Sequence, residues 1–358
     1  MKTSLKIGST IAVVACLTLA GCSATETAEQ NAATGDNGGD QVLTVSIFGG
    51  SWGSAINEHV IKPFEQETGI KVRSVESTST VALGKMRQDP NAFDVALLDS
   101  GVSELSRAEG LVATMPEGKL SHLDELADEA RVSDDDGLWA VTMGFSALGI
   151  AYNTEKVTDP PTAWADLWDP KYAGKVTVPT PETTGGLPLL IQAAKLAGGG
   201  INDIEPGFKK MSELDVVAFF NSSGNASNLL QSGEATVAAH YNPGAWPLAD
   251  QGLPIEWIAP EEGALGQASN WHVSSTTDKA DLALQFIDFA SSAKAQEGLA
   301  QDLYVAPANK NVEVTGEASA RMPYGEGGSL SDLKFSDWNV INEHRSEWSQ
   351  AWNEKVAH

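Results

Sequence analysis

Cysteine is almost absent from this chain of 358 residues. The only two, Cys16 and Cys22, lie near the N-terminus. Residues 23–358 therefore have no thiol for a disulfide, a thiolate metal site or a cysteine nucleophile.

Positive charge is also scarce. The chain has 23 Lys and Arg against 48 Asp and Glu, for a net charge of −25, and its longest basic run is Lys209-Lys210. Because nucleic acids are bound through clustered Lys and Arg, we expect no nucleic-acid partner. The 42% hydrophobic content nevertheless predicts a packed globular protein.

The N-terminus has the order of an export signal. Lys2 and Lys6 precede an apolar stretch centred on Ile11 to Ala20. A membrane-spanning helix needs about 20 apolar residues, so this shorter run predicts a signal peptide. No other apolar segment of the sequence is long enough to span a bilayer.

The end of this signal, Leu19-Ala20-Gly21-Cys22, resembles the lipobox of bacterial lipoproteins. The resemblance implies removal of residues 1–21 and acylation of Cys22, which would anchor the protein to the membrane. Residues 22–41 are polar and rich in Gly, Ala and Thr, as expected of a flexible tether. We therefore expect an extracytoplasmic protein, lipid-anchored to the outer face of the cell membrane, or a periplasmic one.

The rest of the chain alternates short apolar runs with helical patterns, which predicts an α/β fold with mostly parallel strands. The predicted strands are 42–48, 70–75, 95–98, 147–153, 175–179, 216–220, 235–240 and 255–258. The clearest helical patterns cover 282–289 and 337–355. The length predicts two lobes of about 150 residues.

Recognisable enzyme and metal motifs are few. The six His include no H-x-x-x-H pair, and no Gly-rich segment has the Lys of a P-loop. The acidic run at residues 134–137 lacks the alternating ligands of a calcium loop and is interpreted as a solvated turn. We expect no catalytic residue, no metal and no cofactor.

Three segments each follow a predicted strand and precede a predicted helix: Gly49-Gly50-Ser51-Trp52, Asp99-Ser100-Gly101 and Thr183-Thr184-Gly185-Gly186. In α/β sheets such loops line ligand sites, and N–H groups at helix starts bind anionic or polar groups. Each segment could equally be an ordinary turn. Aromatic residues near strand ends, which could cover an organic ligand or hold an ammonium group, are Trp52, Tyr241, Trp246, Trp271 and Tyr304.

Several longer segments resemble the bacterial extracellular solute-binding proteins of ABC importers, especially the spermidine/putrescine-type branch. The segments that carry the resemblance are 47–52, 62–72, 162–176, 230–242 and 338–352. It implies a two-lobe periplasmic-binding-protein fold of type II, with a hinge and a ligand cleft between the lobes. Residues 42–149 and 275–325 would form lobe 1, and residues 150–274 and 326–358 would form lobe 2.

The resemblance and the strand-end loops together predict a set of ligand-binding residues. They are Ser51, Trp52, Asp99, Ser100, Glu182, Thr183, Thr184, Tyr241, Asn242, Ser269, Trp271, Tyr304 and Asn339. Glu182 or Asp99 would face a cationic group of the ligand, and helix-start N–H groups at Ser51 or at Thr183 and Thr184 would take a carboxylate. Ser269 stands where relatives of that branch have an Asp, which argues against a long polyamine.

The resulting hypothesis is a monomeric, non-enzymatic receptor that captures a small amine-containing or zwitterionic solute and delivers it to an ABC permease. The solute could be polyamine-like, an amino acid derivative or opine-like. Two alternatives remain open. One is a ferric-iron receptor of the same superfamily, and the other is a secreted hydrolase that uses paired carboxylates.

Overall fold

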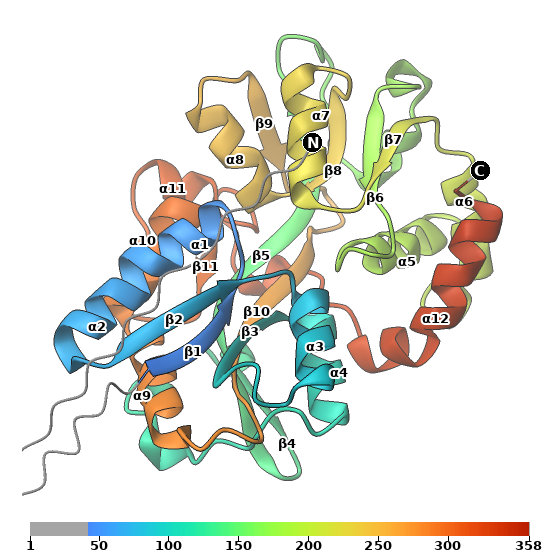
Figure 1. The fold of residues 1–358 in the computed structure, drawn as a ribbon. Coiled ribbons are helices and arrows are strands. Elements are labelled where there is room, and N and C mark those ends of the chain that lie inside the picture. Colours follow the sequence, from blue (N-terminus) through green and yellow to red (C-terminus); the bar gives the residue numbers. More distant parts are fainter. Residues whose placement is uncertain (1–41, 358) are drawn as a thin grey trace, which may run out of the picture. The chain divides into compact units, whose positions relative to one another are not determined.

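The computed structural model describes residues 42–357, which form one mixed sheet of eleven strands with helices packed around it (Figure 1). The strands are β1 (Val42–Ile47), β2 (Lys71–Glu76), β3 (Val95–Asp99), β4 (Arg131–Asp134), β5 (Gly137–Asn153), β6 (Val176–Pro179), β7 (Val216–Phe220), β8 (Val237–Tyr241), β9 (Ile255–Ile258), β10 (Leu265–Val273) and β11 (Ala306–Pro307).

The helices with α geometry are α1 (Ser51–Ile56), α2 (Lys62–Thr68), α3 (Ser79–Gln88), α4 (Ser100–Ala108), α5 (Gly186–Leu196), α6 (Glu205–Ser212), α7 (Ser223–Ser232), α8 (Asn242–Asp250), α9 (Ala280–Ala290), α10 (Ala293–Leu303), α11 (Glu317–Ala320) and α12 (Trp338–Lys355). A π-helical segment, Asn57–Ile61, joins α1 to α2 without a break. No helix among these residues is long and apolar enough to cross a membrane.

Two groups of parallel strands lie at opposite ends of the sheet (Figure 1). One group is β2-β1-β3 and the other is β8-β6-β7. Between them lie β10 and β5, which pair antiparallel with each other and with the flanking strands β3 and β8. The two groups therefore run in opposite directions, and their carboxyl ends point toward each other across β10 and β5.

The prediction of mostly parallel strands was wrong. Six of the ten strand pairings are antiparallel, because β5 pairs in that sense with β4, β8, β9, β10 and β11, and β10 also pairs antiparallel with β3. The predicted strand at residues 147–153 is the second half of β5, and β10 was not predicted. The other predicted strands agree with the observed ones to within about two residues.

Local sequence explains where several elements end. Gly69 terminates α2 in the left-handed region, with φ of 74°, which a residue without a Cβ adopts at little cost. In β3 and β8 the last residue, Asp99 or Tyr241, is extended and the next residue already starts a helix. These two strand ends are thus fixed directly to the starts of α4 and α8.

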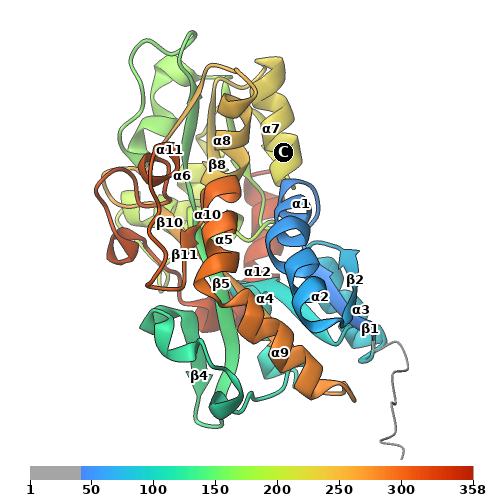
Figure 2. The same cartoon turned by 90° about the vertical axis from the view of Figure 1, so that its left-hand side faces the viewer.

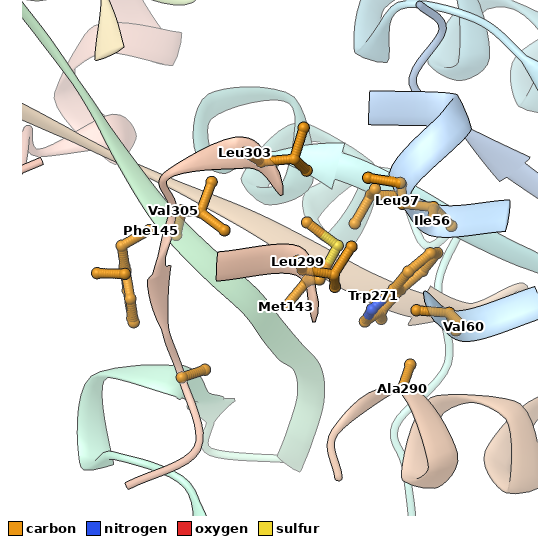
Figure 3. Close-up of a cluster of buried hydrophobic side chains, with 14 of the residues drawn as sticks. Ile56, Val60, Leu97, Met143, Phe145, Trp271, Ala290, Leu299, Leu303 and Val305 are labelled. Atoms are coloured by element: carbon orange, nitrogen blue, oxygen red, sulfur yellow. The ribbon is translucent and has the colours of Figure 1, made fainter. Parts of the chain in front are cut away.

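The apolar side chains form three cores, and β5 contributes to each of them. Figure 3 shows part of the largest core, where Trp271 of β10 and Met143 of β5 lie among side chains of α1, α9 and α10. In Figures 1 and 2, α10 lies beside α1, although more than 200 residues separate them in the chain. Burial of these side chains stabilises the fold by about 25 cal/mol for each Å² of apolar surface.

The structure does not test the predictions about the N-terminal 41 residues or about the boundary between two lobes. The signal peptide, the tether and the lipidated Cys22 lie outside the described residues. The division into two lobes stays a prediction.

Candidate functional site

The carboxyl ends of β3 and β8 bring polar side chains to one region of the sheet. Asp99 at the end of β3 is opposite Ser269 of β10, and Tyr241 at the end of β8 is opposite Leu148 of β5. In the register of β10 with β5, Leu148 faces Leu265, four residues before Ser269. Asp99 and Tyr241 therefore approach each other from the two groups of parallel strands.

Asp99 has an unusual environment for a carboxylate. Its Oδ2 accepts a hydrogen bond from Ser79 Oγ at 3.0 Å, and its Oδ1 accepts one from Ser269 Oγ at 3.4 Å. Within residues 42–357, no Lys, Arg or His pairs with it. Because burial disfavours the charged form more than the two hydroxyls favour it, the pKa of Asp99 rises to about 6.

From the family resemblance, we expected an Asp in the spermidine/putrescine-type branch at the position that Ser269 occupies in this chain. The structure brings the Asp99 carboxylate to Ser269 from the neighbouring strand, where the two residues are in register. Ser269 itself is 1% exposed. A carboxylate is therefore present at this part of the sheet, although β3 supplies it.

Tyr241 and Thr184 form the other half of the cluster. The Thr184 and Tyr241 hydroxyls lie 2.9 Å apart, and a Cβ at Gly185 would come within 2.6 Å of Tyr241 Oη. Burial raises the pKa of Tyr241, and the nearby negative charge of Asp99 raises it further. Tyr241 thus remains a neutral hydroxyl that can donate or accept a hydrogen bond.

Two predicted residues are buried and fix the backbone around this cluster. Ser100 Oγ accepts a hydrogen bond from the Ala268 N–H at 3.0 Å and donates one to the Ala268 carbonyl at 3.1 Å. Asn242 Oδ1 accepts from the Ala147 N–H at 3.0 Å, and its Nδ2 donates to the Tyr304 carbonyl at 2.7 Å. Their side chains hold strands and loops in place.

The structure does not bring the side chains of Trp271 and Tyr304 into this cluster. Trp271 is fully buried within the hydrophobic cluster that Figure 3 shows. Its ring packs edge-on against that of Phe286, with 5.4 Å between the ring centroids. Tyr304 Oη donates to Asp250 at 2.7 Å, at the far end of α8 from Asn242. Eight residues of helix separate these ends by about 12 Å.

Three further predicted residues lie at the margins. Glu182 is exposed, and Thr183 donates its hydroxyl to the Thr180 carbonyl at 3.0 Å. Asn339 is exposed in the first turn of α12, where its N–H is capped by Asp337. Within residues 42–357, no hydrogen bond joins Glu182 or Asn339 to Asp99 or Tyr241, whereas a side-chain hydrogen bond from Thr183 lowers the pKa of Tyr241.

Ser51 and Trp52 form the first turn of α1, at the same edge of the sheet as Asp99. The Trp52 ring packs edge-on against the Phe48 ring, with 5.4 Å between the ring centroids. The Glu76 carboxylate lies against the start of this helix, since a Cβ at Gly53 would come within 2.8 Å of Glu76 Oε1. A ligand carboxylate would meet this negative charge, which argues against the predicted anion contact at Ser51.

Residues 49–53 read Gly-Gly-Ser-Trp-Gly and match the G-x-S-x-G pattern of serine hydrolases, a match that the sequence reasoning missed. Such a serine needs a His base within hydrogen-bond reach. The His side chains of residues 42–357 have other hydrogen-bond partners, on Asp302, Asp288, Ser227, Ser103 and Glu347 among others. No hydrogen bond in this range joins a His to Ser51.

Sequence reasoning also missed two polar residues of the cluster. Ser79 starts α3, which follows β2, and β1 separates β2 from β3 in the sheet, so only the three-dimensional fold brings Ser79 to Asp99. Gln267 lies two residues before Ser269 and is 4% exposed. The spacing of Gln267 and Ser269 could have indicated a shared face of a strand, had residues 265–273 been recognised as one.

Comparisons with known proteins agree with this architecture. The family of bacterial extracellular solute-binding proteins matches residues 92–341. The spermidine/putrescine-binding periplasmic protein of Escherichia coli is 25% identical over 248 residues, covering 67% of this chain and 70% of that protein. The gamma-aminobutyric acid-binding protein of Pseudomonas aeruginosa is 25% identical over 340 residues, covering 87% and 91%.

Solved structures share the fold at lower identity. An ABC transporter protein from Clostridium perfringens has a TM-score of 0.74 at 24% identity, with 88% of this chain and 99% of that chain covered. A periplasmic binding protein of Agrobacterium tumefaciens in complex with agropinic acid has a TM-score of 0.74 at 19% identity, with the same coverage. The predicted α/β periplasmic-binding-protein fold is confirmed, and the chain belongs to the family of bacterial extracellular solute-binding proteins.

Proposed function

We propose that this protein is the receptor of an ABC importer and captures a small solute with a primary amine, such as an amino acid derivative or another zwitterion. The observation that carries the proposal is Asp99, whose carboxylate has only hydroxyl partners in the described part of the chain. A carboxylate removed from water is stabilised by an opposite charge nearby. A ligand ammonium group would supply that charge.

The arrangement favours a short ligand over a long polyamine. Asp99 is the half-buried carboxylate of the cluster, whereas Glu182 is exposed and Ser269 carries no charge. The hydroxyls of Thr184 and Tyr241 lie on the other side of the cluster and can bind an oxygen of the ligand. Two relatives named above bind spermidine, putrescine or gamma-aminobutyric acid, all of which are amines.

A binding role without catalysis fits the same residues. The relatives are named as solute-binding proteins. Ser51, the serine of the G-x-S-x-G match, has no hydrogen-bonded His within residues 42–357. The two lobes would consist of residues 42–149 with 275–325 and of residues 150–274 with 326–358. The ligand would be captured unchanged between them. The receptor, itself a monomer, would then deliver the ligand to the permease subunits.

The N-terminal residues would keep such a receptor at the cell surface. Removal of residues 1–21 and acylation of Cys22 would tether it through residues 22–41. Mass spectrometry of the protein purified from membranes should find diacylglycerol on Cys22, and a Cys22→Ser variant should appear in the soluble fraction. Equal membrane recovery of the two proteins would contradict the anchor and leave the ligand proposal intact.

The ligand class is tested by titrating the purified protein with 4-aminobutyrate, putrescine, spermidine and agropinic acid. Calorimetry gives the affinity, and the fluorescence of the ten tryptophans reports the accompanying change in structure. We expect saturable one-to-one binding of at least one short amine, and weaker binding of spermidine. Failure of every amine to bind would overturn the proposal, as would the appearance of a reaction product.

A further inference from the structure

Gln267 is a buried polar side chain of this region that has no hydrogen-bond partner on its amide nitrogen. It is 4% exposed, and its Nε2 is buried without a hydrogen-bond partner. Its Oε1 also has no partner among the hydrogen bonds found for residues 42–357. Buried amides are usually hydrogen-bonded, so one without a partner at the middle of the sheet requires an explanation.

The strand registers give the position of Gln267 in the cluster. It lies on β10 between Ser269, which faces Asp99, and Leu265, which is in register with the Leu148 partner of Tyr241. Side chains two residues apart on a strand share a face. Gln267 therefore lies on the same face as Ser269, midway between the two halves of the cluster.

The residue opposite Gln267 on β5 is Ser146, which is 5% exposed. Its hydroxyl also has no hydrogen-bond partner in the described part of the chain. The middle of this face thus has an amide and a hydroxyl. Ser269, which is opposite Asp99 of β3, lies two residues or about 7 Å further along β10, because a strand rises 3.2–3.4 Å for each residue.

We infer that Gln267 binds an oxygen of the ligand and makes the site selective for an ω-amino acid over a diamine. This inference rests on the proposed function. The ligand ammonium would lie at Asp99 and Ser269, and the Gln267 Nε2–H would donate to the ligand carboxylate. A diamine has no acceptor for this donor, and its second ammonium would meet only the neutral Gln267 Oε1, so that charge would be buried without a counter-charge.

The test compares two ligands of similar length, 4-aminobutyrate and putrescine, on Gln267→Glu and Gln267→Met. In Gln267→Glu the new carboxylate repels a carboxylate and attracts an ammonium. We expect 4-aminobutyrate to bind at least tenfold more weakly and putrescine to bind more tightly than to the unaltered protein. In Gln267→Met, the affinity for 4-aminobutyrate should fall about tenfold and that for putrescine should change less than threefold.

Gln296→Met is the matched control, because Gln296 is also buried with an unpartnered Nε2. Its Oε1, however, accepts a hydrogen bond from the Asn309 N–H at 2.7 Å. This variant should lower the melting temperature and leave the ratio of the two affinities unchanged. Gln267→Met should keep the melting temperature of the free protein, since it removes an unpaired donor.

Each outcome separates the inference from the proposed function. If the unaltered protein binds 4-aminobutyrate or putrescine and the Gln267 variants change both affinities by the same factor, Gln267 is structural and the inference is wrong. The receptor proposal then stands. If the unaltered protein binds putrescine more tightly than 4-aminobutyrate, the inferred selectivity is also wrong. If it binds no amine at all, both proposals fail.

Discussion

Replacing Asp99 with Asn should make the free protein more stable and its ligand binding weaker. The substitution keeps the shape of the side chain and its capacity to bond Ser79 and Ser269, and removes the charge. The Asp99 pKa is 3.8 in its ordinary state and about 6 in the fold. Since each pKa unit corresponds to about 1.4 kcal/mol, burial of the charge costs the folded state about 3 kcal/mol at neutral pH.

The pH dependence of this effect has a definite sign. Between pH 4 and pH 6 the folded protein holds a proton on Asp99 that the unfolded chain has released, so this group makes the fold less stable as the pH rises. Above pH 6 the cost is constant, and below pH 4 it disappears. Asp99→Asn should therefore raise the free energy of unfolding by about 2–3 kcal/mol at pH 7.5, and by little at pH 3.5.

Binding should change in the opposite direction. An ammonium ligand pairs with the ionised carboxylate, so the affinity of the unaltered protein should fall about tenfold for each pH unit below 6, and Asp99→Asn should lose this dependence. At pH 7.5 the variant should bind an amine at least a hundredfold more weakly, since a charged hydrogen bond in a buried site contributes about 1.5–3 kcal/mol and the ion pair adds to it.

Urea unfolding and calorimetry at several pH values measure both effects. Asp135→Asn is the control, because Asp135 is exposed in the turn between β4 and β5 and should change neither quantity. Unchanged affinity in Asp99→Asn would refute the assignment of the ammonium to this residue. A variant that is less stable than the unaltered protein at pH 7.5 would refute the burial argument.

Two other substitutions test the framework of the cluster. Asn242→Ala leaves the Ala147 N–H and the Tyr304 carbonyl unpaired, so the free energy of unfolding measured in urea should fall by about 2–4 kcal/mol. The control Asn311→Ala, at an exposed position, should lower it by less than about 0.5 kcal/mol. Equal losses in the two variants would contradict the bridging role of Asn242. Gly185→Ala places a methyl group 2.6 Å from Tyr241 Oη. It should displace the Tyr241 ring and weaken ligand binding about tenfold in calorimetry. The control Gly84→Ala lies in α3, where the new carbon has nothing within 4 Å. It should leave the affinity unchanged and raise the free energy of unfolding by about 0.5–1 kcal/mol.

The strand-end residues of the cluster could be predicted because local sequence determines them. Asp99 and Tyr241 each end a short apolar run, and the next residue starts a helix. Such a transition is visible within ten residues of sequence. The fold class followed from the same alternation of apolar runs and helical patterns, together with the family resemblance.

The central part of the sheet was harder to predict, because its registers depend on residues far apart in the chain. β10 reads Leu-Gly-Gln-Ala-Ser-Asn-Trp-His-Val and has no alternation of apolar and polar residues, since it is buried on both faces. Its antiparallel pairing brings Ser269 to Asp99, 170 residues away in the sequence. Gln267 was missed for this reason, and Trp271 was assigned to the ligand although it belongs to the core.

The 17-residue strand β5 has a consequence for how this protein comes apart. At about 3.3 Å for each residue it extends roughly 56 Å, and it supplies side chains to all three cores. Unfolding of either end of the sheet would remove hydrogen-bonded neighbours from β5, and the other end of the sheet also pairs with β5. Heating should therefore give a single calorimetric transition, and the amide protons in the middle of β5 should be among the slowest to exchange with deuterium.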